Sequence, residues 1–377
     1  MKEEGRNWKM GALSSSDEPT RRHAHFDCFS GAAGDMILAA CLDIGGQSLL
    51  EYVSSTLKEG LPAVRDEFSL QHERVWRGMG QIAATHVTVK SVYGDQAVPV
   101  PHKAESRSSH AQDHCHEHTH SHGHQHHISE HLDHDHDHLH GHTHSSSDRP
   151  STAESSARAK EATPGTPQHC HAHDHLATTA TPPGPLRNLP QIRQLLQDAP
   201  ALQYIPAWVR RVAISAFELL AAAEAHVHGA ESPDAVHFHE VGAVDSIVDT
   251  IGSLLALHAL GVSTVSCSPL PLGQGTVRAA HGLLPVPAPA TLFLLKGLPV
   301  TAGPPGLTGE LVTPTGAALL RALLVECGVD GPSAGRPPRF TLQEIGIGAG
   351  TKDFVQHPNI LRVMVGDSVI LDERKQL

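Results

Sequence analysis

A histidine-rich, low-complexity segment limits where this chain can place a folded core. Residues 102–175 hold 21 of the 32 histidines in the sequence, many alternating with another residue, as in His114-Cys115-His116-Glu117-His118. Residues 95–186 otherwise consist mainly of serine, threonine, alanine, proline and acidic residues, which bury too little apolar surface to offset the entropy of ordering the backbone. We therefore predict a disordered insert over 95–186, with folded structure on both sides of it.

The sequence before and after this insert is long enough on each side to form a hydrophobic core. The predicted fold class is α/β (α+β), with a small β-α-β-β unit before the insert and a larger mixed α/β body after it. The predicted boundaries are a disordered N-terminus over 1–22, the small unit over 23–94, the insert over 95–186, the body over 187–366 and a tail over 367–377.

Hydrophobic periodicity and turn residues predict the individual elements. Before the insert we expect a strand over 25–29, a helix over 36–44 that ends at Gly45-Gly46, and hairpin strands over 68–76 and 82–89. After the insert we expect a loop over 269–275, helices over 189–198, 208–228, 245–260, 287–295 and 314–326, and strands over 262–268, 340–347 and 360–365. His226 and His228 close one of these helices, where a protonated imidazole complements the helix dipole; the alternative is that they are further metal ligands.

The overall charge and the cysteine pattern exclude several classes of protein. A formal net charge of −12 argues against a nucleic-acid partner, which requires a basic surface. The six cysteines are scattered without a CxxC pair, as is typical of a reducing compartment. We see no secretory signal and no apolar run of transmembrane length, so we expect no membrane partner. A cytoplasmic location is expected, with an organelle as the open alternative.

The histidine tract itself indicates transition-metal binding, because imidazole suits nickel, copper and zinc alike. A disordered segment cannot fix ligand geometry, so we predict a metal buffer or antenna rather than a catalytic centre. The alternative is a solvated linker whose histidines have no role. The expected ligands in the tract are His114, His116, His118, His120, His122, His124, His134, His136, His138 and His140.

A second group of metal-ligating residue types lies between 237 and 249. In a strand, His237 and His239 would share one face, and Glu240 follows them directly. Asp245 and Asp249 are one helical turn apart, so both carboxylates face the same side. We predict that His237, His239 and Asp249 bind metal, and that His237, His239, Glu240 and Asp245 form the catalytic group. The alternative is that these polar groups cap the helix and bond within a loop.

The loop between the first predicted strand and helix is a candidate anion site. Its backbone amides, at a helix N-terminus, can cradle phosphate, although the Lys-Ser/Thr of a Walker A loop is missing. Asp27 and Asp35 could hold a cation or a substrate hydroxyl, while Asp35 could equally complement the helix dipole. His281 lies in a loop shaped by glycine and proline, where functional residues often occur. The predicted cofactor-binding residues are Asp27, Ser30, Gly31, Gly34, Asp35 and His281.

Five segments in the same order resemble the LarC family of nickel insertion proteins, which mature the nickel-pincer cofactor of lactate racemase. They are 25–36, 237–249, 269–289, 313–317 and 346–351. The resemblance implies an enzyme, a nickel-inserting lyase. It places Ni(II) in pyridinium-3,5-bisthiocarboxylic acid mononucleotide, forming nickel–carbon and nickel–sulfur bonds with hydrolysis of CTP. The implied cofactors are nickel(II) and CTP with Mg or Mn. The implied partners are the mononucleotide substrate, a client racemase and further copies of the chain in a homo-oligomer.

One departure from the family pattern affects this expectation. Family members usually continue into a C-terminal domain associated with CTP binding and oligomerisation, whereas this sequence stops at Leu377. We therefore expect nucleotide-driven insertion to depend on a separate or longer product. The competing interpretation is a non-catalytic, His-rich metallochaperone or metal store for nickel, zinc or copper.

Overall fold

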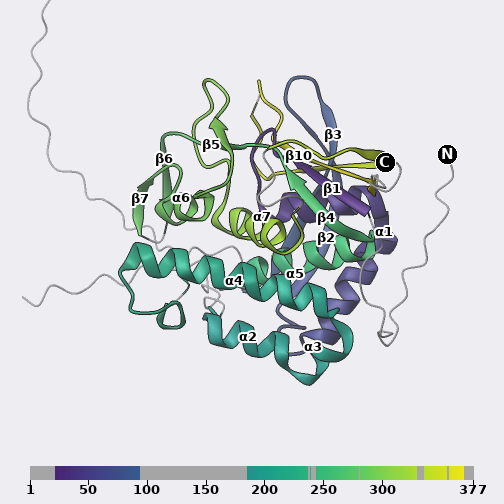
Figure 1. Cartoon of the computed structure of the whole chain (residues 1–377), viewed down its shortest axis with the longest axis vertical. Helices are drawn as coiled ribbons and strands as arrows, with labels where there is room; N and C mark the ends of the chain where they lie inside the picture. Colours follow the sequence, from purple (N-terminus) through teal and green to yellow (C-terminus); the bar gives the residue numbers. More distant parts are fainter. Residues whose placement is uncertain are drawn as a thin grey trace, which may run out of the picture. The chain divides into compact units, whose positions relative to one another are not determined.

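The computed structural model describes residues 22–93, 185–236, 238, 243–279, 281–328, 335–354 and 356–368 (Figure 1). The predictions for the N-terminus, for most of the insert and for most of the tail fall outside these residues. The described part confirms the mixed α/β class, because helices pack against a sheet with both parallel and antiparallel neighbours.

Six strands form the main sheet. In spatial order they are β2 (Phe68–Arg77), β3 (Ile82–Ser91), β9 (Phe340–Ala349), β10 (Ile360–Ser368), β1 (Arg22–Asp27) and β4 (Val262–Cys267). Strand β1 pairs antiparallel with β10 and parallel with β4, while β3 meets β9 in parallel. The β-α-β-β order predicted before the insert is confirmed. Its strands nevertheless share one sheet with strands that follow the insert.

Helices cover this sheet and one another. Helix α1 (Gly34–Gly60) packs against β9, β10 and β3, and also against α5 (Val244–Ala259). Helix α4 (Ala207–His228) contacts α5, α6 (Pro289–Leu295) and α7 (Pro314–Cys327). Two shorter helices precede α4 in sequence, α2 (Leu189–Gln197) and α3 (Ala199–Tyr204). The 3₁₀ turn η1 (Pro233–Ala235) follows α4. Most apolar residues of these helices belong to one core.

Helix α1 differs from its prediction in length. The chain breaks helical geometry at Gly46 (φ 61°, ψ −157°), where we expected the helix to end, but it then resumes as far as Gly60. The resumed part continues because it has its own buried side, which includes Leu49, Val53 and Leu57. By length and composition α1 would suffice to cross a membrane, contrary to our expectation of no such run. Its burial in the core accounts for that apolar character.

Two glycines on β9 set the distance between α1 and the sheet. A Cβ atom at Gly346 would lie 1.9 Å from the carbonyl oxygen of Ala40, and one at Gly348 would lie 2.0 Å from that of Met36. Any side chain at these positions would push the helix away from the strand. This part of the 346–351 segment therefore has a packing role.

Short strands replace part of one predicted loop. Strand β5 (Leu270–Leu272) lies within the predicted loop 269–275 and pairs in parallel with β8 (Val300–Ala302). A three-residue strand that contains a proline has no alternating pattern to reveal it. The hairpin of β6 (Thr276–Ala279) and β7 (Gly282–Pro285) follows, and it was likewise not predicted.

A buried histidine on β1 makes the fold sensitive to acid. The ring of His23 lies 3.1 Å from Thr264 Oγ1 and 2.7 Å from Ser266 Oγ. Burial, with a smaller effect from His25, lowers the pKa of His23 to about 4. An unfolded histidine binds its proton near pH 6.5. Protonation therefore favours the unfolded chain, and this histidine should reduce stability as the pH falls from about 6.5 towards 4.

We expect His23→Gln to flatten the dependence of the melting temperature on pH between 6.5 and 4.5. His226→Gln, at an exposed position, is the matched control and should leave the wild-type slope unchanged. Thermal unfolding followed by circular dichroism across this range measures both slopes. An equal slope in the His23 variant would show that another group causes the acid sensitivity.

Candidate functional site

The loop between β1 and α1 is held against the segment that precedes α7. Gly31 has φ +116°, and a Cβ atom there would lie 1.9 Å from the carbonyl oxygen of Leu311. The amide of Ala32 donates to that same oxygen at 3.0 Å, and the amide of Thr313 donates to the Ala32 carbonyl at 3.0 Å. The glycine predicted for anion binding is thus required by close backbone contact.

Two carboxylates from opposite sides of the insert meet beside this loop. Asp35 lies in the first turn of α1, and Asp249 lies in the second turn of α5. A Cβ atom at Gly34 would lie 2.9 Å from Cβ of Asp249, so Gly34 permits the contact between the two helices. Ser253, one turn further along α5, donates a hydrogen bond from Oγ to the Gly34 carbonyl at 3.2 Å.

Burial raises the pKa of both carboxyl groups. It raises the pKa of Asp35 to about 6, although Asp35 Oδ1 accepts a hydrogen bond from the Met36 amide at 2.8 Å. The pKa of Asp249 lies well above its ordinary value because of burial first, and then the charges of Asp35 and Asp245. Oδ1 of Asp249 is buried and has no hydrogen-bond partner among the described residues. A divalent cation with oxygen ligands would satisfy this atom and offset the charge repulsion.

The remaining predicted residues of the loop make other contacts. Asp27 forms an ion pair with Arg362 on β10, with Nε at 2.8 Å from Oδ2. Ser30 Oγ lies 3.0 Å from His357 Nε2 and donates to the Pro358 carbonyl at 2.5 Å. Asp245 is exposed and accepts a hydrogen bond from the Ser246 amide at 2.9 Å. Of the predicted residues, the structure thus brings Gly34, Asp35 and Asp249 together, with Asp245 close enough for its charge to act on Asp249.

Several predicted ligands lie outside the described residues. They are His237, His239, Glu240 and the ten histidines of the tract. Their roles stay predictions. Within the described ranges, no group of three or more His, Cys, Asp or Glu side chains is arranged to hold a metal ion.

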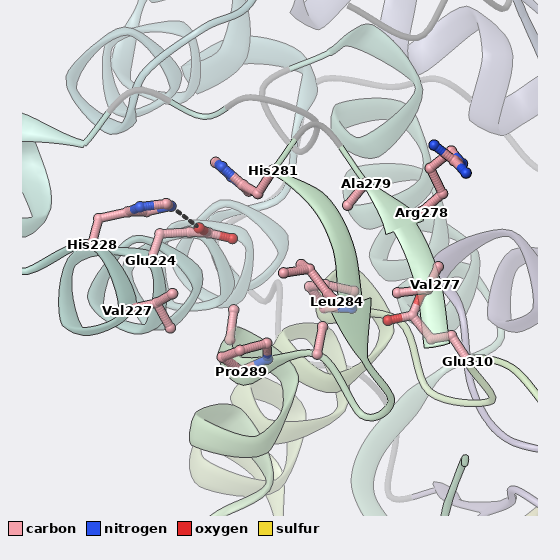
Figure 2. A pocket seen from close by; sticks show the side chains of 13 residues that line it. Glu224, Val227, His228, Val277, Arg278, Ala279, His281, Leu284, Pro289 and Glu310 are labelled. Carbon is pink, nitrogen blue, oxygen red and sulfur yellow. Dashed lines mark ion pairs between the residues drawn. The ribbon is translucent and has the colours of Figure 1, made fainter. Parts of the chain in front are cut away.

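A pocket of about 240 Å³ lies where the end of α4 meets the β6–β7 hairpin (Figure 2). Apolar walls come from Val227, Val277, Leu284, Ala288 and Pro289. Polar side chains at the pocket are Glu224, His228, Arg278, His281 and Glu310. Of the predicted site residues that the structure describes, His281 is the one that lines it.

Two imidazoles adjoin each other at this pocket. The ring centroids of His228 and His281 are 4.7 Å apart, with 50° between the ring planes. Glu224 Oε2 lies 3.3 Å from His228 Nε2, one helical turn away along α4 (Figure 2). The sequence makes His228 a candidate for a further metal ligand but favours a role at the helix end. The signal that could have suggested more is the spacing of four residues between Glu224 and His228.

Comparison with known proteins gives one consistent result. A family model described as "Nickel insertion protein" matches residues 24–377. A "Putative nickel insertion protein" of Synechocystis sp. is 49% identical over 184 residues, which cover 49% of this chain and 40% of that protein. A protein of the same name from Rippkaea orientalis is 33% identical over 354 residues, 94% of this chain and 62% of its own length.

The chain spans less than two thirds of the length of these relatives. The match to the Myxococcus xanthus protein of the same name, 46% identical over 182 residues, covers 48% of this chain and 43% of that protein. No solved structure matches the chain.

Proposed function

We propose that this chain, which belongs to the nickel insertion protein family, inserts Ni²⁺ into pyridinium-3,5-bisthiocarboxylic acid mononucleotide in a CTP-dependent cyclometallation. The product would be the nickel-pincer cofactor used by racemases of the lactate racemase type. In this proposal nickel is a substrate, and the chain acts as a nickel-inserting lyase. The organic mononucleotide and a client racemase are its partners.

The observation that supports a nucleotide-dependent reaction is the half-buried pair of Asp35 and Asp249. Carboxylate oxygens are the ligands that Mg²⁺ and Mn²⁺ prefer, and such ions commonly bridge one or two carboxylates to nucleotide phosphates. The unpartnered Oδ1 of Asp249 fits this use, because a cation would supply the missing contact. Asp35 and Asp249 would then hold the ion that accompanies CTP, and hydrolysis of CTP would supply the driving force.

Insertion also requires ligands that release nickel and a base. Nickel replaces the proton of one ring carbon, so a C–H bond breaks, one Ni–C and two Ni–S bonds form, and the proton passes to a base. His237, His239 and Glu240 are the proposed transfer ligands and base. They precede α5, the helix that carries Asp249, by a few residues. The histidine tract would raise the local nickel concentration, as a tethered ligand does.

Incubation of the protein with Ni²⁺, Mg²⁺, CTP and the bisthiocarboxylic mononucleotide tests this proposal. Mass spectrometry should detect the nickel-containing product, and omission of CTP should prevent its formation. Parallel reactions with the Rippkaea orientalis relative show whether the extra length of that protein is needed. Nickel bound by both proteins with no product from either would contradict the proposal and favour a metallochaperone or store.

A further inference from the structure

We propose that His228 and His281 form a two-imidazole site that holds a divalent transition-metal ion at the wall of the pocket in Figure 2. The ion is nickel if the proposed function is correct, and that identification rests on it. Metal binding at these two side chains does not depend on catalysis.

The geometry brings the two rings together from separate elements. His228 ends α4, whereas His281 lies in the turn between β6 and β7. Their ring centroids are 4.7 Å apart, close enough for both rings to share one ion after small side-chain rotations. Both residues are exposed, so an ion can reach them from solvent.

The chemistry of the neighbours favours a metal ion. Neutral imidazole is a common ligand of nickel and zinc. Metal-binding histidines typically pair with a carboxylate that orients the ring, and Glu224 stands 3.3 Å from the His228 ring. The negative charge of Glu224 would also attract a cation.

The residues that line the pocket beside this site indicate which kind of molecule would bind next to the ion. Two imidazoles leave coordination positions for donors from a second ligand. Val277, Leu284 and Pro289 form an apolar surface next to the histidines, suited to a flat organic ring. We therefore assign the pocket to a planar heteroaromatic acceptor whose own donor atoms complete the coordination of the ion.

One segment links this pocket to the carboxylate pair. Glu310 and Pro314 line the pocket, and between them Leu311 and Thr313 bond to Ala32 in the loop that opens α1. In sequence, α4, which carries His228, is followed after residues 229–243 by α5, which carries Asp249. The imidazole site and the proposed nucleotide-ion site therefore lie on connected parts of the fold.

Peptide-resolved chemical modification of the full chain tests the metal site without interference from the tract. Diethyl pyrocarbonate acylates accessible neutral imidazoles, and mass spectrometry reports each histidine separately. At a free Ni²⁺ concentration about ten times Kd, we expect the modification rates of His228 and His281 to fall about tenfold. His226 is the matched control, because it is exposed on the same helix, contacts Phe293 in a tilted ring arrangement and does not line the pocket.

Single substitutions distinguish a shared ion from local shielding. In His228→Gln, Ni²⁺ should no longer protect His281, and in His281→Gln it should no longer protect His228. His226→Gln should leave both protections intact. Circular dichroism checks that each variant is folded. Modification of His228 and His281 that is unchanged by Ni²⁺ would overturn the site, as would protection of His281 that persists in His228→Gln.

Failure of this site and failure of the proposed function give different results. Protection of both histidines, with no metallated product from this chain or from the Rippkaea orientalis relative, would support the metal site and contradict nickel insertion. Product formation with no protection at either histidine would contradict the metal site alone.

Discussion

Replacing Asp249 with asparagine is expected to reduce nickel insertion on the order of 100-fold and to stabilise the metal-free protein at neutral pH. Activity falls because the amide cannot supply the negative charge that holds the proposed nucleotide-bound ion. Stability rises because Asp249 is a half-buried carboxylate near Asp35, and its buried Oδ1 has no hydrogen-bond partner among the described residues. Removing its charge relieves both the desolvation and the repulsion.

The gain in stability from Asp249→Asn depends on pH, and its direction follows from the raised pKa of Asp249. The pKa of Asp249 is raised on folding, so the stability that this residue contributes is fully present below the unfolded pKa, near 3.9, and is lost as the pH rises towards the folded value. Asparagine does not titrate. The stability gain of Asp249→Asn should therefore grow as the pH rises above about 4.

Thermal unfolding in the presence of a chelator measures the stability effect, and the product assay measures the activity. Asp66→Asn, at an exposed position, is the stability control and should change the melting temperature little. A destabilised Asp249 variant would mean that the carboxylate has a partner in the metal-free protein. Full activity in a folded Asp249 variant would remove this residue from the proposed reaction.

Substituting alanine for Gly31 is expected to destabilise the protein by more than about 4 kcal/mol. The new Cβ would lie 1.9 Å from the Leu311 carbonyl oxygen, and the residue would have to keep φ near +116°. Relief requires the loop before α1 to separate from the segment before α7. That separation would also break the hydrogen bonds of Ala32 with Leu311 and Thr313.

Gly282→Ala separates the steric effect from backbone strain. Gly282 has φ +94°, but among the described residues beyond its chain neighbours no atom lies within 4 Å of the added Cβ, so we expect a cost of only about 1–3 kcal/mol from strain. Urea unfolding of both variants gives the two free energies. Equal losses of unfolding free energy would show that the Leu311 carbonyl moves away from the new Cβ at little cost. Backbone conformation alone would then require glycine at position 31.

The sequence predicted element types well because they depend on local patterns. Alternation identified β2 and β3, and apolar spacing with terminal glycines identified α4 and α5. Such local patterns could not predict the order of the strands in the sheet, because β1 lies between β10 and β4, which come much later in the chain. The break at Gly46 was visible, but the buried side that lets α1 resume is defined only by packing.

The sequence predicted individual residues of the candidate site but not their arrangement in space. Asp35 and Asp249 were each identified from their helix positions, yet their contact depends on Gly34 and on how α1 packs against α5. His281 was identified from its loop. For its neighbour His228 a role at the helix end was preferred to that of a metal ligand, because the hairpin that brings the two rings together has no signal in the sequence.

The position of β10 has a consequence for synthesis of this protein on the ribosome. Strand β10 lies between β9 and β1, and of the strands that the structure describes in this sheet it leaves the exit tunnel last. The β2–β3 hairpin can form early because its partners are adjacent in sequence, but β1 must wait for β4 and then for β10. During translation the nascent chain therefore exposes an unpaired β1, whose residues 23–26 are buried in the finished sheet, and such an edge is the kind that chaperones protect from aggregation.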